Sequence, residues 1–212
     1  MRFLVSAGPT REHIDPVRFL SNRSTGKMGF AIAAAAAMAG HEVALVAGPV
    51  SLPTPEGVRR VDVISARDML SSLEAELAEA DVLVMAAAVA DWRPKETASV
   101  KLKKRSMAPV IELEPNPDIL ATLAPQKGGR LFIGFAAETG DLEHEARRKL
   151  EAKNLDFICA NDVSRADAGF GVDTNIVTVY GRNGFLETIP LMSKLDVAKR
   201  IVELVTMACR KS

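Results

Sequence analysis

The sequence of residues 2–46 is RFLVSAGPTREHIDPVRFLSNRSTGKMGFAIAAAAAMAGHEVALV. It contains two short runs of aliphatic and β-branched residues, 2–6 and 42–46, on either side of an alanine-rich apolar stretch at 28–39. Runs of about four to eight such residues are typical of buried strands, whereas the longer stretch has the length of a helix. This part of the chain therefore predicts a strand, a helix and a second strand.

The same alternation continues along the chain. Residues 58–63 and 81–85 are further predicted strands, and residues 66–79 are a predicted helix. After these come a helix at 117–123, a strand at 131–135, a helix at 141–154 and a strand at 156–159. Because strands that alternate with helices form parallel sheets with helices on both faces, we predict a Rossmann-like, doubly wound α/β fold with a mostly parallel sheet.

The last part of the chain has a different pattern. Two β-like runs, 176–180 and 185–189, flank the sequence Gly-Arg-Asn-Gly at 181–184, which predicts a C-terminal β-hairpin. A final helix is predicted at about 193–208. The hairpin is a candidate surface for the pairing of two subunits, or it simply extends the edge of the sheet.

Length and composition limit the class of protein. The 212 residues, 48% of them hydrophobic, suit one substantial core, so we predict a single domain over 1–212. Lys plus Arg and Asp plus Glu both number 27, which argues against nucleic acid as a partner. Cys159, Cys209 and the three histidines are too scattered for a disulfide framework or a zinc site. No apolar run is long enough to span a bilayer and no signal-peptide pattern begins the sequence, so we expect no membrane partner and a cytoplasmic location.

Residues 92–115 fit neither the strand pattern nor the helix pattern. They hold three prolines and little periodicity, so they form either a solvated charged loop or a functional flap. Charge alone favours the solvated loop. However, the stretch follows the predicted strand 81–85, and doubly wound sheets bind ligands beyond the carboxyl ends of their strands, so we interpret it as a basic flap over a site. Its basic residues include Lys95, Lys101, Lys103, Lys104 and Arg105.

The loop at 21–29, Ser-Asn-Arg-Ser-Thr-Gly-Lys-Met-Gly, precedes the alanine-rich helix. Small and hydroxyl-bearing residues at a helix start leave backbone N–H groups and the positive end of the helix dipole for a phosphate. The loop is not a Walker A motif, because Ser21 and Met28 stand where that motif needs Gly and Ser or Thr, and the chain has no GxGxxG. An ordinary capped helix with a glycine turn explains the loop equally well.

Three further groups lie where predicted strands end or helices begin. Residues 86–94 are small residues that permit close approach by a ligand, with Asp91 at the mouth. Residues 116–120 are typical of a helix N-terminus with Pro117 at the first helical position. Residues 134–139 end another strand at the same edge of the sheet. Each group alone has a structural explanation that is at least as good.

Lys149 and Lys153 lie four residues apart and therefore share one face of a predicted helix. There they could bind a triphosphate together, or they could complement the negative end of the helix dipole. The structural explanations do not account for the convergence of all these groups at one sheet edge. That convergence favours a site for a nucleoside triphosphate.

A series of motifs in order along the chain resembles bacterial phosphopantothenate–cysteine ligase, also called phosphopantothenoylcysteine synthetase. These motifs are residues 8–12 with 15–19, 21–29, 86–94, 101–104, 116–119, 134–139 and 157–162. They cover nearly the whole chain, which makes the resemblance far more specific than one glycine-rich loop. The family makes 4'-phosphopantothenoylcysteine for coenzyme A biosynthesis. The resemblance implies a ligase that uses CTP with Mg²⁺, forms an acyl-cytidylate, and releases pyrophosphate and then CMP.

The resemblance also implies the site residues. In the reacting centre, Lys101 would neutralise developing charge and Asn22 would hold the acyl carbonyl while the cysteine amine attacks. Arg18 would pair with the anionic substrate or position the intermediate, and Ala88 would contribute its small size and its backbone. Protein ligands of Mg²⁺ are not implied, since the triphosphate would hold most of the ion. The implied CTP contacts are Met85, Ala86, Ala87, Asp91, Lys101, Pro117, Asp118, Ile119, Leu120, Phe135, Lys149 and Lys153.

The same resemblance implies partners. The family is dimeric and its lysine-bearing flap closes over the site, so a homodimer is expected here. In many bacteria the domain is fused to a flavin-dependent decarboxylase that performs the next step. A natural fusion or association with such a decarboxylase is therefore expected, with no FMN on this chain. The small-molecule partners implied are 4'-phosphopantothenate, cysteine and CTP.

Two other classes of protein would share the fold. A Rossmann-type oxidoreductase would carry GxGxxG and an acidic residue that closes the second strand, and the chain lacks a convincing match to either. A non-catalytic nucleotide sensor would bind CTP and release no pyrophosphate. Neither class explains the lysines at 101–104 together with Asn22. No side chain selects CTP over ATP, because backbone groups at 117–120 would contact the base, so the choice of CTP follows from the resemblance.

Overall fold

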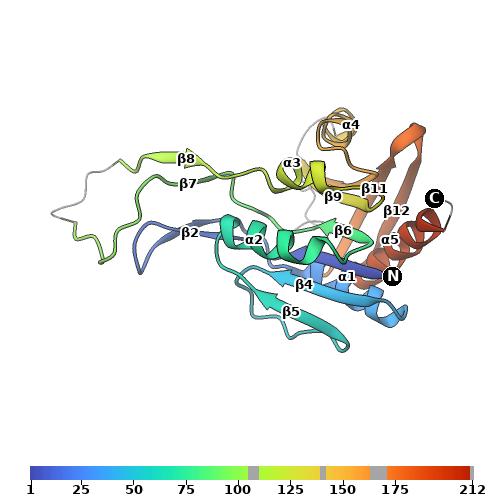
Figure 1. The fold of residues 1–212 in the computed structure, drawn as a ribbon, viewed down its shortest axis with the longest axis horizontal. Coiled ribbons are helices and arrows are strands. Elements are labelled where there is room, and N and C mark those ends of the chain that lie inside the picture. The colour runs from blue at the N-terminus through green and yellow to red at the C-terminus, as the bar shows by residue number, and fades with distance from the viewer. Residues whose placement is uncertain (105–109, 139–141, 163–170, 211–212) are drawn as a thin grey trace.

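A computed structural model describes residues 1–104, 110–138, 142–162 and 171–210. Its centre is an eight-stranded sheet (Figure 1). In spatial order the strands are β12 (Leu186–Ser193), β11 (Thr174–Gly181), β10 (Phe157–Asp162), β9 (Leu131–Glu138), β6 (Val82–Met85), β1 (Arg2–Ala7), β4 (Glu42–Ala47) and β5 (Val58–Asp62).

The sheet confirms the predicted α/β fold. The strands from β10 to β5 are parallel to one another. Counted along the chain, these six strands have the spatial order 3-2-1-4-5-6 that is characteristic of Rossmann folds. The hairpin of β11 and β12 extends the sheet, because β11 pairs antiparallel with β10. The order reverses between β1 and β6, which is where such sheets bind ligands.

Helices cover both faces of the sheet. Alternation along β1 directs Phe3 and Val5 to one face and Leu4 to the other, and each face has its own buried cluster. The first cluster includes residues of α1 and α5, and the second includes residues of α2, α3 and α4. The helices are α1 (Lys27–Met38), α2 (Ala66–Leu77), α3 (Ile119–Leu123), α4 (Leu142–Ala152) and α5 (Lys194–Cys209), with 3₁₀ turns at Ala124–Gln126 and Arg182–Gly184.

Local sequence sets where several helices begin. The hydroxyl of Ser65 accepts from the Asp68 backbone N–H, and the Asp68 carboxylate accepts from the Ser65 N–H, which is a capping box at the start of α2. Ser193 caps α5 by accepting from the Asp196 N–H at 3.1 Å. Across the described ranges, no helix combines the length and the apolar character that a membrane crossing requires.

One sequence prediction about α3 is wrong. Pro117 does not occupy the first helical position, because Asp118 is the N-cap and the helix begins at Ile119. The Asp118 carboxylate accepts from the Ala121 N–H at 3.1 Å, so an aspartate cap takes precedence over the usual placement of proline. Pro117 therefore precedes the cap. The strands β9 and β10 also extend beyond the predicted ends at 135 and 159, to Glu138 and Asp162. Each is therefore longer than predicted at the carboxyl edge of the sheet.

Two antiparallel strand pairs form an arm that projects from the sheet (Figure 1). We define the arm as residues 11–21, 92–104 and 110–115. Its strands are β2 (Arg11–His13) with β3 (Phe19–Ser21), and β7 (Trp92–Pro94) with β8 (Leu113–Pro115). Sequence analysis missed β2 and β3 and treated 92–115 as a loop, because strands of three residues are too short to show a periodicity. Arg105 and residues 106–109 lie outside the described residues.

Helix α1 lies unusually close to strand β1 at Gly29. A Cβ atom at this position would lie 2.5 Å from the Cβ of Ala7 and 2.9 Å from the carbonyl oxygen of Ser6. Both neighbours are in the central strand of the sheet, so neither can move without disturbing it. Glycine at position 29 is therefore a packing requirement.

We predict that Gly29→Ala lowers the free energy of unfolding by about 1–3 kcal/mol, because the added methyl forces helix and strand apart. Urea denaturation followed by circular dichroism measures the change. Gly129→Ala is the control: a Cβ there meets nothing within 4 Å, so its effect should stay within about 0.5 kcal/mol. Equal stability of the two variants would contradict the close contact.

Candidate functional site

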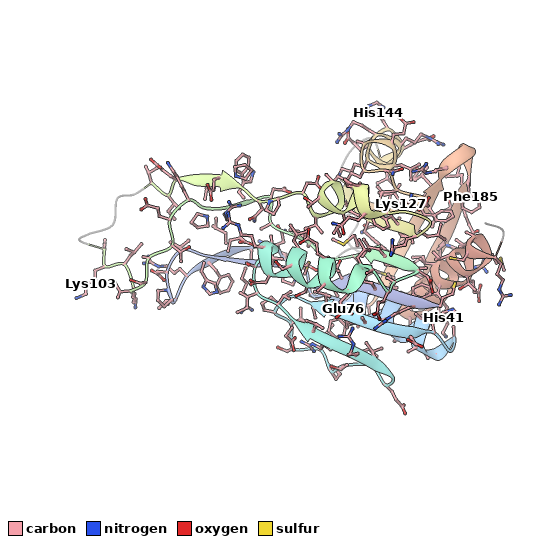
Figure 2. All side chains as sticks on the ribbon, in the orientation of Figure 1. His41, Glu76, Lys103, Lys127, His144 and Phe185 are labelled. Atoms are coloured by element: carbon pink, nitrogen blue, oxygen red, sulfur yellow. The ribbon has the colours of Figure 1, made fainter. Side chains whose placement is uncertain are left out.

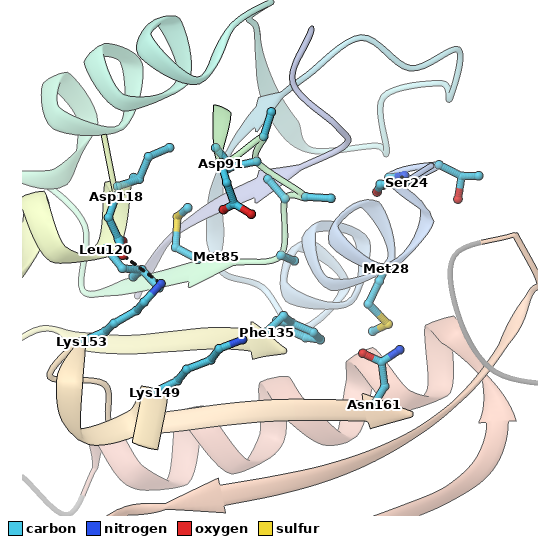
Figure 3. Close-up of a pocket in the computed structure, with 18 of the residues that line it drawn as sticks. Ser24, Met28, Met85, Asp91, Asp118, Leu120, Phe135, Lys149, Lys153 and Asn161 are labelled. Carbon is cyan, nitrogen blue, oxygen red and sulfur yellow. Dashed lines mark hydrogen bonds and ion pairs between the residues drawn. The ribbon is translucent and has the colours of Figure 1, made fainter. Parts of the chain in front are cut away.

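A pocket of about 360 Å³ lies at the carboxyl edge of the parallel sheet (Figure 3). Met85 at the end of β6, Phe135 in β9 and Asn161 in β10 line it, together with residues at the start of α1 and α3 and in α4. Its volume is in the range of small-molecule sites, and its position at the reversal of strand order is the usual one for this fold. The pocket is therefore the candidate functional site.

The pocket wall contains every residue that the sequence resemblance assigns to CTP, apart from Lys101. It also contains Ala88 from the expected reacting centre. These residues come from separate elements, so the fold brings them together although they are far apart in the chain. The wall residues in question are Met85, Ala86, Ala87, Asp91, Pro117, Asp118, Ile119, Leu120, Phe135, Lys149 and Lys153.

The Ala-rich segment after β6 is held by the end of β1. The Ser6 hydroxyl accepts from the Ala87 N–H at 3.2 Å, and the Thr10 hydroxyl accepts from the Ala90 N–H at 3.0 Å. The Ala88 N–H donates to the Gly8 carbonyl at 2.9 Å. Ser6 and Thr10 are wholly buried. These bonds fix a backbone wall whose side chains are only methyl groups and one isopropyl group, so a ligand can approach it closely.

Asn22 contacts the same segment from the loop before α1. Its amide Nδ2 donates to the carbonyls of Ala88, at 3.0 Å, and Val89, at 3.1 Å. The neighbouring Ser21 hydroxyl donates to the Thr10 carbonyl at 2.7 Å, which ties the loop to the end of β1. Asn22 therefore lies beside Ala88 as expected, and in this structure its amide binds backbone carbonyls.

A second wall comes from the start of α3. The Asn116 side chain donates to the Ala90 carbonyl at 2.8 Å, and its backbone N–H donates to the Asp91 carbonyl at 2.8 Å. Asn116 thereby joins the α3 entry to the segment after β6. Asp118 follows, and its carboxylate both caps α3 and pairs with the Lys153 ammonium at 3.1 Å.

The two lysines of the α4 region, whose spacing predicts one shared face, both lie on the pocket side. Lys149 is in the last turn of α4 and Lys153 follows its end; both are part of the wall. Figure 3 shows the two side chains extending from α4 toward Phe135 and Asp118. Positive charge therefore lies next to an aromatic ring, a combination that suits a ligand with a planar group and an anionic group.

The far end of the pocket contains part of the loop at 21–29, for which the sequence allowed either a phosphate site or an ordinary capped helix. Helix α1 begins after Gly26, whose φ of 78° lies in the left-handed region that favours glycine, and this N-cap makes no side-chain capping bond. Lys27 forms an ion pair with Asp173 at 2.6 Å. Burial, and then the nearby charge of Lys27, lower the pKa of Lys194. The wall residues at this end include Ser24, Thr25, Gly26, Lys27, Met28, Asn161, Asn175 and Lys194.

Sequence signals for these residues were weak. Lys27 belongs to the loop at 21–29, a candidate phosphate site, whereas Asn161 lies in the motif 157–162 and nothing in its spacing assigned it to a site. Lys194 is the first residue of α5, where a cation opposes the helix dipole. This unfavourable placement is the one sequence signal that the Lys194 side chain has tertiary partners. In the structure its ammonium donates to the Val172 carbonyl at 2.6 Å.

Arg18 and Lys101 do not line the pocket of their own chain. Both belong to the arm, where the Arg18 guanidinium donates to the Asp15 carboxylate and to the Leu102 carbonyl. Lys101 is exposed and immediately precedes Leu102. Of the four residues expected in the reacting centre, only Ala88 lines the pocket. Asn22 does not line it but binds the Ala88 carbonyl, and Arg18 and Lys101 lie on the arm.

The cysteine thiols are poorly suited to nucleophilic chemistry. Cys159 is wholly buried, and burial raises the pKa of its thiol far above the usual range, so the reactive thiolate is not formed at neutral pH. Cys209, the last residue of α5, is half-buried and forms no disulfide, and burial raises the pKa of its thiol as well. Within the described ranges, no group of three His, Cys, Asp or Glu side chains could hold a metal ion.

Comparison with known proteins identifies the family. Residues 1–208 match the family described as the DNA/pantothenate metabolism flavoprotein C-terminal domain. The chain belongs to this family. A solved structure described as the C-terminal domain of the coenzyme A biosynthesis bifunctional protein CoaBC is 44% identical and has a TM-score of 0.86, covering 100% of this chain and 96% of that one. The recognition of the coenzyme A biosynthesis domain from sequence motifs is therefore confirmed.

Other members of the family are also similar. The DNA/pantothenate metabolism flavoprotein from Streptococcus pneumoniae has a TM-score of 0.84 at 25% identity, covering 98% of this chain and 99% of that one. The bifunctional CoaBC of Bacillus subtilis is 49% identical over 201 residues, which is 94% of this chain and 50% of that protein. The bifunctional CoaBC of Escherichia coli K12 is 47% identical over 198 residues, which is 92% of this chain and 48% of that protein. The chain thus spans about half the length of the two bifunctional CoaBC proteins.

We predict that Thr10→Val destabilises the protein by about 1–3 kcal/mol, although the two side chains have nearly the same shape. The change removes the acceptor of the Ala90 N–H, which leaves a buried donor without its partner. Urea denaturation measures the loss, and Thr54→Val on the exposed surface is the control with almost no expected effect. If the two variants were equally stable, the Thr10 contact would not hold the pocket wall.

Proposed function

We propose that residues 1–212 act as one ligase domain that activates 4'-phosphopantothenate with CTP and joins it to cysteine. The products would be 4'-phosphopantothenoylcysteine, pyrophosphate and CMP. The observation that carries this proposal is the pocket wall, in which the segment after β6, the start of α3, Phe135 and the lysines of the α4 region meet. Membership of a family whose relatives are named for coenzyme A biosynthesis supports it.

The pocket has separate surroundings for the parts of a nucleotide. Small residues from Ala86 to Ala88 and the ring of Phe135 give a flat, mostly apolar surface for a base or sugar. Lys149 and Lys153 supply positive charge for phosphate oxygens. We propose that backbone groups at 117–120 contact the base, and the preference for CTP is carried over from the family.

The first step brings two anions together. A carboxylate oxygen of 4'-phosphopantothenate would attack the α-phosphorus of CTP, forming an acyl-cytidylate while the bond to the β-phosphate oxygen breaks and pyrophosphate leaves. Such a reaction depends on cations at the places where negative charge develops. We propose that Lys101 neutralises the reacting phosphoryl group, and that Lys149 and Lys153 hold the leaving pyrophosphate.

The second step needs an oriented acyl group. The amine of cysteine would attack the acyl carbon, CMP would leave, and the amine proton would pass to solvent. Asn22 already donates to the carbonyls of Ala88 and Val89 at the edge of the pocket. We propose that Asn22 exchanges one of these bonds for the acyl carbonyl and so holds the intermediate for attack, without adding charge.

The pocket fits a metal that arrives with the nucleotide. Two carboxylates, Asp91 and Asp118, belong to the wall, and the described residues contain no cluster of three metal-binding side chains. A Mg²⁺ ion would therefore be held mainly by the triphosphate oxygens. Of the two wall carboxylates, Asp118 pairs with Lys153, so Asp91 would be the protein ligand if one is needed. When bound, the ion would supply charge neutralisation to the phosphates.

The arm supports a homodimer. Exposed apolar side chains gather on it: the exposed fractions are 57% for Val17, 54% for Trp92 and 72% for Val110. Phe19 and Leu113 are also exposed there. Burial of such side chains against a second copy would be favourable. Because Arg18 and Lys101 of the arm lie outside their own pocket, we propose that dimer formation completes the reacting centre.

The named relatives are bifunctional, so we also propose a natural fusion or association with a phosphopantothenoylcysteine decarboxylase. The FMN of such a partner is not expected to bind to residues 1–212. A cytoplasmic location remains part of the same proposal. None of these partners changes the chemistry proposed for the pocket.

The test is pyrophosphate release by the purified protein with 4'-phosphopantothenate, cysteine and Mg²⁺. With CTP, release should depend on 4'-phosphopantothenate, and 4'-phosphopantothenoylcysteine should appear in equal amount by mass spectrometry. ATP in place of CTP should support a much lower rate. Release that needs no 4'-phosphopantothenate would overturn the ligase assignment, and faster turnover with ATP would overturn the nucleotide assignment alone.

We predict that Asn22→Asp impairs transfer to cysteine more strongly than formation of the acyl-cytidylate. The substitution replaces an amide donor by a negative charge beside the Ala88 and Val89 carbonyls and beside an anionic intermediate. The first step depends mainly on cations elsewhere, so the intermediate should accumulate. Single-turnover mixtures analysed by mass spectrometry give both rates.

Thr10→Val is the control for this prediction, because it disturbs the same backbone segment without changing Asn22. It should lower both rates together. If Asn22→Asp also lowers both steps by one factor, Asn22 acts only by shaping the backbone. A folded Asn22→Asp protein with normal product formation would remove Asn22 from the reaction.

A further inference from the structure

The Asp15 carboxylate is wholly buried in the turn between β2 and β3. One oxygen, Oδ1, accepts from the backbone N–H groups of Val17 at 2.8 Å and Arg18 at 2.9 Å. The other, Oδ2, accepts from the Arg18 guanidinium, with the Nε contact at 3.0 Å. Each oxygen therefore accepts two hydrogen bonds from the same turn. The turn closes with the Ile14 N–H donating to the Arg18 carbonyl at 2.9 Å.

The same carboxylate reaches a distant part of the chain. The backbone N–H of Leu102 donates to Asp15 Oδ2 at 3.1 Å, and the Leu102 carbonyl accepts from Arg18 Nη2 at 2.8 Å. Both backbone groups of Leu102 are thus bound by one ion pair. We call the contacts among Asp15, Arg18 and Leu102 the Asp15 clamp. It holds residues 101–104, which form no helix or strand and lead toward the end of the arm, where Figure 2 labels Lys103.

The electrostatics of the clamp make it persistent. The Arg18 guanidinium beside Asp15 holds the pKa of that carboxyl well below its usual range, and the backbone donors act in the same direction against the effect of burial. A carboxyl with a lowered folded pKa contributes stability above its unfolded pKa of about 3.9, and this contribution is lost as the pH falls through the folded value. Between pH 5 and pH 8 the clamp should therefore remain fully ionised and closed.

We propose that Asp15 is a positioning residue of the ligase reaction, which fixes Lys101 and Arg18 as one unit through the backbone of Leu102. The inference rests on the proposed function of Lys101. Lys101 is bonded directly to Leu102, so the two contacts of Leu102 set the place from which the Lys101 side chain starts. A side chain with four rotatable bonds reaches a phosphoryl group reproducibly only when its backbone is fixed.

A second contact between the same two segments offers a matched control. The Thr97 hydroxyl donates to the His13 carbonyl at 3.0 Å, and the Ala98 N–H donates to the Ile14 carbonyl at 3.0 Å. These bonds also join residues 92–104 to the β2–β3 turn, but they involve no charged group and lie before Lys101. If any contact between these two segments were enough to order the arm, loss of the Thr97 bond and loss of the Asp15 charge would have similar effects on Leu102 exchange and on kcat.

The experiment compares the wild-type protein with Asp15→Asn and Thr97→Val. Hydrogen exchange of the Leu102 amide is read by mass spectrometry, together with kcat, KM for 4'-phosphopantothenate and the dissociation constant for Mg·CTP. Asp15→Asn should speed exchange at Leu102 by about tenfold or more, because the charged acceptor is lost. It should lower kcat by a similar factor and leave Mg·CTP affinity within about twofold, since a misplaced Lys101 affects the transition state more than the pocket. Thr97→Val should change neither Leu102 exchange nor kcat appreciably.

The outcomes separate the inference from the proposed function. Wild-type protein that releases no pyrophosphate overturns the ligase proposal, whereas Leu102 exchange still tests the clamp. Faster exchange in Asp15→Asn with unchanged kcat overturns the positioning role, and unchanged exchange overturns the clamp itself. A parallel loss of Mg·CTP affinity, kcat and dimer formation would assign Asp15 a merely structural role. If Asp15→Asn does not fold, Arg18→Lys provides the same exchange measurement, because it keeps the buried charge paired and removes the Nη2 contact to the Leu102 carbonyl.

Discussion

The junction between the end of β1 and the segment after β6 is the contact on which the rest of the site depends. Ser6, Gly8 and Thr10 on one side bind the backbone of residues 87–90 on the other. Strand β2 of the arm leaves from the first segment and strand β7 leaves from the second. One set of buried hydrogen bonds therefore fixes both the pocket wall and the base of the arm. These bonds lie where the strand order reverses, and a doubly wound sheet has a crevice for ligands at that point.

Much of the fold and of the pocket could be predicted from the sequence. The long alternation of apolar runs predicted the parallel sheet. The spacing of Lys149 and Lys153 predicted one shared face, and both residues are part of the pocket wall. Short elements could not be predicted, because β2, β3, β7 and β8 have three residues each and no periodicity. Pro117 was predicted at the first helical position, but Asp118 is the N-cap and the helix begins at Ile119. Helix propensities do not say which of two neighbouring residues caps a helix. Lys194 and Asn175 could not be assigned because only tertiary packing brings them to the wall.

The arm and the pocket differ in how they are stabilised. The pocket walls belong to the central sheet and its helices, where apolar burial on both faces fixes the backbone. The arm has no such core, and its apolar side chains are largely exposed. Its internal order depends on polar contacts such as the Arg93 ion pair with Glu114 at 2.7 Å and the buried carboxylate of Asp15. A basic segment can therefore be presented to an anionic ligand without being part of a hydrophobic core.

The ion pair between Asp118 and Lys153 has a consequence for selectivity. The Lys153 ammonium has a counterion 3.1 Å away, and that counterion is the residue that caps α3. Any anion that binds to Lys153 must displace this carboxylate or share the ammonium with it, so binding is an exchange of partners. A small monovalent anion gains little from such an exchange, whereas a polyphosphate can offset the lost ion pair with several contacts at once. The Asp118 counterion would thus favour ligands of high charge density at Lys153.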